Sequence, residues 1–158
     1  MVFFIARKLH ESCTFISFNI REKCFTIKSK ESDMWIEYNP NPLKKRVGDC
    51  AVRAVAKALD ISWLNAFLLI IVDAIRLCDM PSSNGVWGAT LYRHGFKRES
   101  VPSCDDCYNA EDFCNEFFKG TYVLGFGTHV ATVIDGNLYD SWNSLSEIPQ
   151  YYWYKGDE

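Results

Sequence analysis

From residue 49 of this 158-residue chain the hydrophobic pattern changes once, from helical spacing to short strand-like runs, and that change limits the folds open to it. From residue 49 to about residue 118, apolar side chains recur at the intervals that place them on one face of a helix. From residue 121 to 154, short runs rich in β-branched and aromatic residues alternate with turn residues. Helices followed by an antiparallel meander predict an α+β protein.

Turn and capping residues give the expected element boundaries. Helices are predicted over residues 50–59, 62–77, 83–95 and 110–118, and strands over 121–126, 129–134, 138–142 and 150–154. Upstream, short strands are predicted at 13–18, 23–28 and 34–38, before Asn39-Pro40-Asn41-Pro42 breaks any regular structure. The interpretation is an accessory β-rich segment, residues 1–38, followed by the main domain, residues 39–158.

Composition and charge argue against several classes of protein. With 48% hydrophobic and 23% charged residues, the chain is expected to form one globular domain with its own core. The net charge of −3 argues against sequence-independent nucleic-acid binding, which needs a basic surface. No apolar run approaches the roughly 20 residues of a membrane span, and the first residues lack the pattern of a signal peptide. A cytoplasmic location, with the seven cysteines reduced, is therefore expected.

Cys50 stands at the beginning of the first predicted helix, in Gly48-Asp49-Cys50. A cysteine in the first helical turn has its thiolate stabilised by the positive end of the helix and by unpaired backbone N–H groups. The same N–H groups can receive the oxyanion that forms when a carbonyl is attacked. Asp49 is expected to cap the helix, although its charge opposes thiolate formation. Cys50 is therefore the candidate nucleophile, and the alternative is a small buried apolar residue.

A hairpin downstream of Cys50 brings a histidine and an acid together. Asp135-Gly136 favours a two-residue type I′ turn. In that register Ala131 faces Asp140, and His129 becomes a diagonal neighbour of Asp140 on the same face, roughly 7 Å away. A three-residue loop would move Asp140 to the other face, so the inference depends on the turn.

Cys50, His129 and Asp140 are therefore predicted to form a catalytic triad. In this triad the Cys50 thiolate is the nucleophile, His129 takes and returns the proton, and Asp140 holds the imidazole in one tautomer. The same register places Asn143 on the opposite face, away from the imidazole.

The order and topology of these residues resemble the papain-like cysteine peptidase superfamily. The resemblance rests on Cys50 at a helix start, His129 on a later strand and Asp140-Ser141-Trp142 on the next, and it is closest to small bacterial or phage-type members and to double-glycine leader peptidases. The family often has Asn-Ser-Trp where this chain has Asp-Ser-Trp. The resemblance covers residues 39–158 and implies a nucleophile-bearing helix packed on an antiparallel sheet. It also implies that Trp142 shields the bond between base and acid.

One residue that is typical of this family is missing from the chain. Papain-like enzymes usually carry a Gln several residues before the nucleophile as an oxyanion donor, and no Gln stands in that stretch here. Asn41, Asn39 and the neighbouring Asp49 are the candidates for oxyanion or substrate contacts, with the Cys50 backbone N–H as a second donor. The missing Gln is also the best sequence support for a scaffold kept for binding rather than catalysis.

Cys104-Asp105-Asp106-Cys107 is the other notable cluster. A Cys-x-x-Cys pair suits zinc or redox exchange, but a structural zinc site needs four ligands, and only Cys114 and Cys78 could complete one. The flanking acids repel thiolates, and no thioredoxin-like pattern surrounds the pair. A structural or incidental role is expected, with zinc binding and redox exchange as alternatives. No metal and no cofactor are predicted.

The resemblance implies a cysteine-nucleophile hydrolase that cleaves peptide or isopeptide bonds through an acyl-enzyme thioester. A triad alone does not separate a peptidase from an amidase, deamidase or acyltransferase. A non-catalytic papain-like binding or effector module is the competing class. The expected partner is a protein or peptide substrate, with no nucleic acid and no membrane, and the sequence leaves the oligomeric state open.

Overall fold

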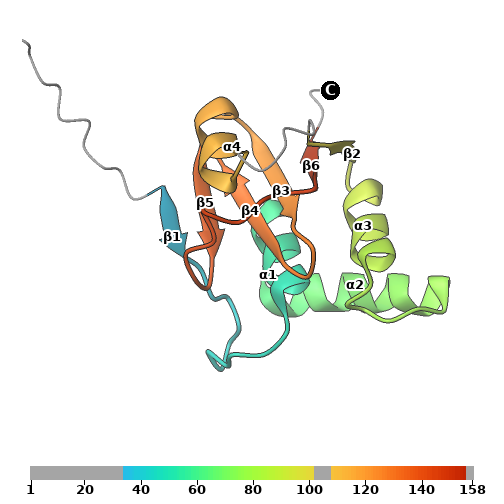
Figure 1. Cartoon of the computed structure of the whole chain (residues 1–158). Coiled ribbons are helices and arrows are strands. Elements are labelled where there is room, and N and C mark those ends of the chain that lie inside the picture. The colour runs from blue at the N-terminus through green and yellow to red at the C-terminus, as the bar shows by residue number, and fades with distance from the viewer. Residues whose placement is uncertain (1–33, 102–107, 156–158) are drawn as a thin grey trace, which may run out of the picture. The chain divides into compact units, whose positions relative to one another are not determined.

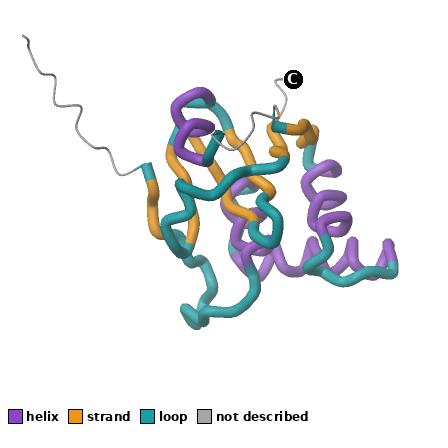
Figure 2. Tube along the Cα trace, viewed as in Figure 1, coloured by secondary structure: helices purple, strands orange, loops and turns teal. Residues whose placement is uncertain are grey.

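The computed structural model describes residues 34–101 and 108–155, which lie in a compact unit spanning Glu31–Glu158. The strands expected at 13–18 and 23–28 lie outside the described residues. The elements are shown in Figures 1 and 2 and are, in chain order, β1 (Trp35–Glu37), α1 (Cys50–Ala58), α2 (Trp63–Leu77), α3 (Asn84–Arg93), β2 (Phe96–Ser100), α4 (Ala110–Glu116), β3 (Thr121–Gly125), β4 (Val130–Ile134), β5 (Asn137–Asp140) and β6 (Tyr151–Lys155).

A six-stranded sheet in the order β1-β5-β4-β3-β6-β2 forms the centre of the unit. Strands β2 to β6 pair antiparallel, whereas β1 pairs parallel with β5, from Trp35 opposite Leu138 to Glu37 opposite Asp140. The α+β class is confirmed. The expectation of a purely antiparallel sheet is wrong, because β1, which the sequence assigns to the accessory segment, adds in parallel to the edge of this sheet.

Alternate residues of the central strands face two separate cores. Val123 and Trp153 contribute to a core shared with α1, α2 and α3, whereas Leu124 and Tyr152 contribute to a second core with α4. This division follows from the two-residue period of a strand. The sheet is thus a middle layer between three helices and one (Figure 1).

Small side chains let α1 approach the sheet closely. Ala51, Ala54 and Ala56 are all buried, as a helix packed against a sheet requires. The hydroxyl of Thr132 on β4 donates to the backbone carbonyl of Ala54 at 3.0 Å. This bond fixes α1 against the strand that follows His129.

The hairpin between β4 and β5 has the predicted register. Asp135 and Gly136 have φ angles of 48° and 74°, the left-handed values that both central positions of a type I′ turn require. Ile134 pairs with Asn137, as a two-residue loop demands. Asp140 therefore lies on the predicted face of the sheet.

Strand β2 is not predicted by the sequence. It pairs with β6 at an edge of the sheet, and Phe96 is its one buried residue. A strand that buries a single side chain lacks the alternation by which strands are recognised.

No single helix in the described ranges is long and apolar enough to cross a membrane. Only α1 and α2 taken together reach that length and hydropathy, across a bend of 110°.

Candidate active site

Cys50 is the first residue of α1, so its thiol lies at the N-terminal end of the helix. The side chain is partly exposed. Backbone N–H groups of Ala51, in the helix, and of Val130, at the start of β4, lie near enough to the thiol to lower its pKa. The sulfur therefore lies where the helix and the strand meet.

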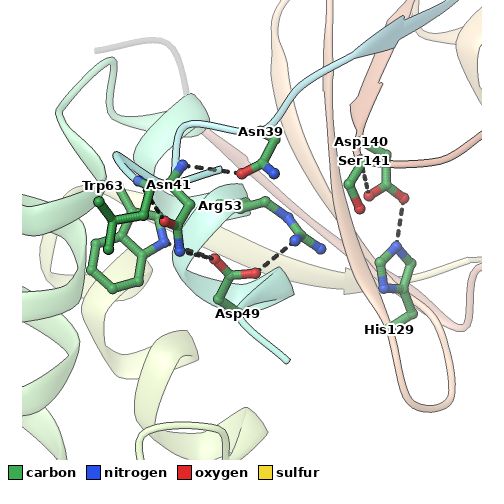
Figure 3. Close-up of polar contacts among 9 residues, drawn as sticks. Asn39, Asn41, Asp49, Arg53, Trp63, His129, Asp140 and Ser141 are labelled. Carbon is green, nitrogen blue, oxygen red and sulfur yellow. Dashed lines mark hydrogen bonds and ion pairs between the residues drawn. The ribbon is translucent and has the colours of Figure 1, made fainter. Parts of the chain in front are cut away.

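Asp49 occupies the N-cap position, but its side chain makes no capping hydrogen bond. The buried carboxylate instead accepts from Arg53 Nη1 at 2.6 Å and from Trp63 Nε1 at 2.9 Å (Figure 3). The predicted side-chain cap is wrong, because these partners draw the carboxylate away from the helix end. Since Arg53 balances its charge, Asp49 opposes a thiolate on Cys50 less than a free carboxylate would.

His129 and Asp140 are joined directly. Imidazole Nε2 lies 2.5 Å from Asp140 Oδ2, as Figure 3 shows. The same oxygen accepts the Ser144 hydroxyl at 2.6 Å, and Oδ1 accepts the backbone N–H of Ser141 at 2.6 Å. The backbone N–H of Tyr38, just after β1, donates to the Asp140 carbonyl at 2.7 Å. Asp140 is hydrogen-bonded at its side chain and at its backbone, and its carboxylate in turn fixes the orientation of the imidazole.

Two aromatic rings hold the His129 imidazole from its faces. Phe126 lies 5.8 Å from it, centre to centre and nearly parallel, and Trp142 lies 5.3 Å away at a tilt of 43°. Asn143 is exposed, and its side-chain oxygen accepts a backbone N–H of its own loop at 3.2 Å. The predicted contacts of Asp140 and Trp142 with the imidazole, rather than of Asn143, are confirmed.

The pKa shifts of Cys50 and His129 favour an ion pair. Burial alone raises the pKa of the Cys50 thiol, but the hydrogen bond and charge of His129, with the two backbone N–H groups, lower it below the usual 9.0. Burial likewise lowers the pKa of His129, but its bonds to Asp140 and Cys50 outweigh this and raise it from 6.5 to about 9. Since Nε2 faces Asp140, Nδ1 is the ring nitrogen left for Cys50. Both shifts act in the direction that favours a thiolate beside an imidazolium.

The other described cysteines have different environments. Cys78 is exposed at the end of α2. Cys114 is buried, and burial followed by the charge of Glu111 raises its thiol pKa to about 12. Of the cysteines in the described ranges, Cys50 alone has an imidazole partner.

Two cavities adjoin Cys50. The first, here the apolar cavity, has a volume of about 560 Å³, and its large side chains are Trp63, Phe67 and Trp87. The second, here the triad cavity, has a volume of about 440 Å³ and is lined by His129, Trp142 and polar side chains, notably Glu37, Asn39, Arg46 and Arg53. Cys50 borders both, so a bound substrate can place different groups on its two sides.

The structure separates the three candidates for oxyanion or substrate contacts. Asn41 is buried, with Nδ2 3.5 Å from the Asp49 carboxylate and Oδ1 accepting a backbone N–H at 3.0 Å. The side chains of Asn41 and Asp49 are thus both hydrogen-bonded within the protein. Asn39 lines the triad cavity, and its Oδ1 accepts the Asn41 N–H at 3.1 Å, which turns the amide nitrogen away (Figure 3). Of the three, Asn39 has the side-chain donor best placed for a substrate.

Two site residues are missed by the sequence reasoning. Ser144 belongs to no motif, and its approach to Asp140 depends on the path of an irregular loop. Arg53 lies three positions after Cys50, a spacing that puts two helical residues on one side. That spacing is a signal from which its presence could have been predicted.

No group of three or more His, Cys, Asp or Glu side chains in the described ranges could hold a metal ion. Cys104 and Cys107 lie outside those ranges, so their role stays a prediction.

Comparisons of this chain with models of known protein families, with curated proteins and with solved structures find no match.

Proposed function

We propose that the protein is a cysteine-nucleophile hydrolase of papain-like chemistry, with Cys50, His129 and Asp140 as its catalytic residues. The observation that carries the proposal is the chain of contacts from the Asp140 carboxylate through the imidazole to the thiol at the helix end. A nucleophile, a base and an acid that orients the base are the parts that thiol hydrolysis needs.

In the first half of the reaction, the Cys50 thiolate attacks a substrate carbonyl carbon and a C–S bond forms. Imidazolium His129 gives its Nδ1 proton to the leaving amine as the C–N bond breaks, which leaves a thioester on Cys50. A water molecule then attacks the thioester and passes a proton to His129. The C–S bond breaks, the carboxylic acid product departs, and the thiolate–imidazolium pair is restored.

Backbone donors at the start of α1 support the developing oxyanion in this proposal. The first N–H groups of a helix have no intrahelical partner and point toward the position that an attacked carbonyl oxygen takes. Backbone N–H groups thus take the place of the missing Gln, and the Asn39 amide is left for another part of the substrate.

A peptide is the substrate class that the surroundings of Cys50 favour. The apolar cavity is large enough for a bulky side chain and presents aromatic rings to it. The triad cavity presents hydrogen-bonding groups suited to a polar backbone.

Cleavage of a peptide library by the wild-type chain and by Cys50→Ala tests the proposal. We expect wild-type products to share a bulky apolar residue beside the scissile bond, and Cys50→Ala to yield none. If both chains yield no product, the competing binding module, favoured by the missing Gln, is the better account.

A further inference from the structure

The triad cavity holds hydrogen-bond donors that the proposed catalysis does not use. The Arg53 side chain is only 10% exposed, and its one bonded donor is Nη1, which meets Asp49 at 2.6 Å. No acceptor in the described part of the chain bonds to Nε or Nη2, and neither nitrogen is sealed from solvent. Figure 3 shows the guanidinium extending from α1 toward the side on which His129 lies. Both nitrogens can therefore donate to a ligand that enters the cavity.

Two further donors line the same cavity. The amide nitrogen of Asn39 is turned away from Asn41. Arg46 is exposed, and within the described ranges it makes no ion pair. The opposing charge on the wall is the exposed carboxylate of Glu37. Two guanidinium groups and one carboxylate, besides the His129 imidazole, thus line this side of Cys50.

We infer that this side of the cleft binds a carboxylate of the substrate, held by Arg53, Asn39 and Arg46. The inference rests on the proposed function and adds a substrate class to it. A planar guanidinium offers two parallel N–H groups that match the two oxygens of a carboxylate. Arg53, already paired with Asp49, supplies the geometry, and Arg46, which makes no ion pair in the described ranges, supplies the preference for a negative charge.

The two cavities together define the substrate. Cys50 borders the apolar cavity as well as the triad cavity, so the scissile bond lies between a bulky apolar group and a carboxylate. An acidic side chain and a free C-terminus present the same carboxylate chemistry. Both are therefore possible sources within this one class.

The test uses two small alkylating reagents that differ mainly in charge, iodoacetate and iodoacetamide, and needs no known substrate. The second-order rate constant for Cys50 is measured with each reagent on the full chain by peptide mass mapping. We expect Arg46→Gln, Asn39→Ala and Arg53→Gln each to lower the iodoacetate-to-iodoacetamide ratio by about threefold or more, the effect of one nearby charge or donor. Lys97→Gln, which removes an exposed charge on β2 remote from the cavity, should leave the ratio unchanged.

The outcomes separate this inference from the proposed function. A ratio that is the same in wild type and in all three cavity variants overturns the carboxylate site while Cys50 remains reactive. Slow reaction of Cys50 with both reagents, no faster than Cys78, overturns the thiol hydrolase instead, and the inference with it. Arg46→Gln keeps the test decisive if Arg53→Gln does not fold, because Arg46 is exposed.

Matched peptides then distinguish the two sources of carboxylate. Faster cleavage beside Glu than beside Gln identifies an acidic side chain, and faster cleavage of a C-terminal acid than of its amide identifies a chain end. Equal cleavage in both comparisons contradicts the inference.

Discussion

Asp140 accepts hydrogen bonds from His129, Ser141 and Ser144 through a single carboxylate. Because both oxygens are engaged, the carboxylate cannot turn from the imidazole without breaking other bonds. The orientation of His129 therefore depends on the loop after β5 as well as on the hairpin.

At this scale the raised pKa of His129 is directly measurable. Its value of about 9 depends on Asp140 and on Cys50, so Cys50→Ala and Asp140→Asn should each lower it. Titration of the imidazole by NMR measures this. Because 9 lies above the unfolded value of 6.5, the contribution of His129 to the free energy of unfolding is complete below pH 6.5 and is lost as pH rises through 9. An unchanged His129 pKa in Cys50→Ala would show that no thiolate faces the ring.

Substitutions of the acid should follow a defined order. Asp140→Asn should impair turnover of a cleaved library peptide less than Asp140→Ala, because an amide can still orient the ring. Cys50→Ala should abolish turnover. Equal activity of Asp140→Ala and wild type would remove Asp140 from the proposed mechanism.

Substitution of Ser144 tests the contribution of its hydrogen bond to Asp140. Ser144→Ala removes one buried hydrogen bond to Asp140 and should lower the free energy of unfolding by about 1 kcal/mol. Ser141→Ala is the matched control, since Ser141 donates through its backbone, and it should stay within about 0.5 kcal/mol of wild type. Urea denaturation measures both. Equal effects of the two variants would contradict the assigned role of Ser144.

At the scale of the elements, the sequence best predicted the features that local signals determine. The β4–β5 hairpin follows from Asp135-Gly136 because a type I′ turn sets the register within two residues. The parallel pairing of β1 with β5 joins Trp35 to Leu138 across the length of the chain, and no periodicity encodes such a partner. Asp49 occupies the predicted N-cap position but makes no side-chain cap, because its carboxylate bonds to Arg53, one helical turn on, and to Trp63, which reaches it only in the folded chain.

The turn that sets the register is sensitive to a side chain at Gly136. Its φ is +74°, and an added Cβ would lie 3.1 Å from the carbonyl oxygen of Cys114. Gly136→Ala should therefore lower the free energy of unfolding by about 1–2 kcal/mol. In the control, Gly85→Ala in α3, the new Cβ meets no atom nearer than 3.7 Å and should not destabilise the chain. Similar urea midpoints for the two variants would argue against the turn.

For the whole molecule, β1 is part of the sheet that carries the site. The Met34 carbonyl accepts the backbone N–H of Leu138 at 2.6 Å, and the Tyr38 N–H donates to the carbonyl of Asp140. The compact unit accordingly begins at Glu31, earlier than the predicted start of the catalytic domain at Asn39. The segment of the edge strand is thus connected to Asp140, the acid of the proposed triad.

Shortened chains test where the folding unit begins. A chain of residues 31–158 should unfold cooperatively and keep the reactivity of Cys50, because it retains β1 and its pairing with β5. A chain of residues 39–158 should be less stable to urea, since it loses the strand beside β5. Equal stability of the two would favour the boundary at residue 39.

The central claim is that His129 activates Cys50, and limiting iodoacetamide at pH 7 followed by peptide mass mapping tests it most directly. Cys78 is exposed and Cys50 only partly so, which means that accessibility alone favours labelling of Cys78. We predict that Cys50 is modified first in the wild-type chain and that His129→Ala abolishes this preference. Labelling of Cys78 ahead of Cys50 in both chains would contradict the claim.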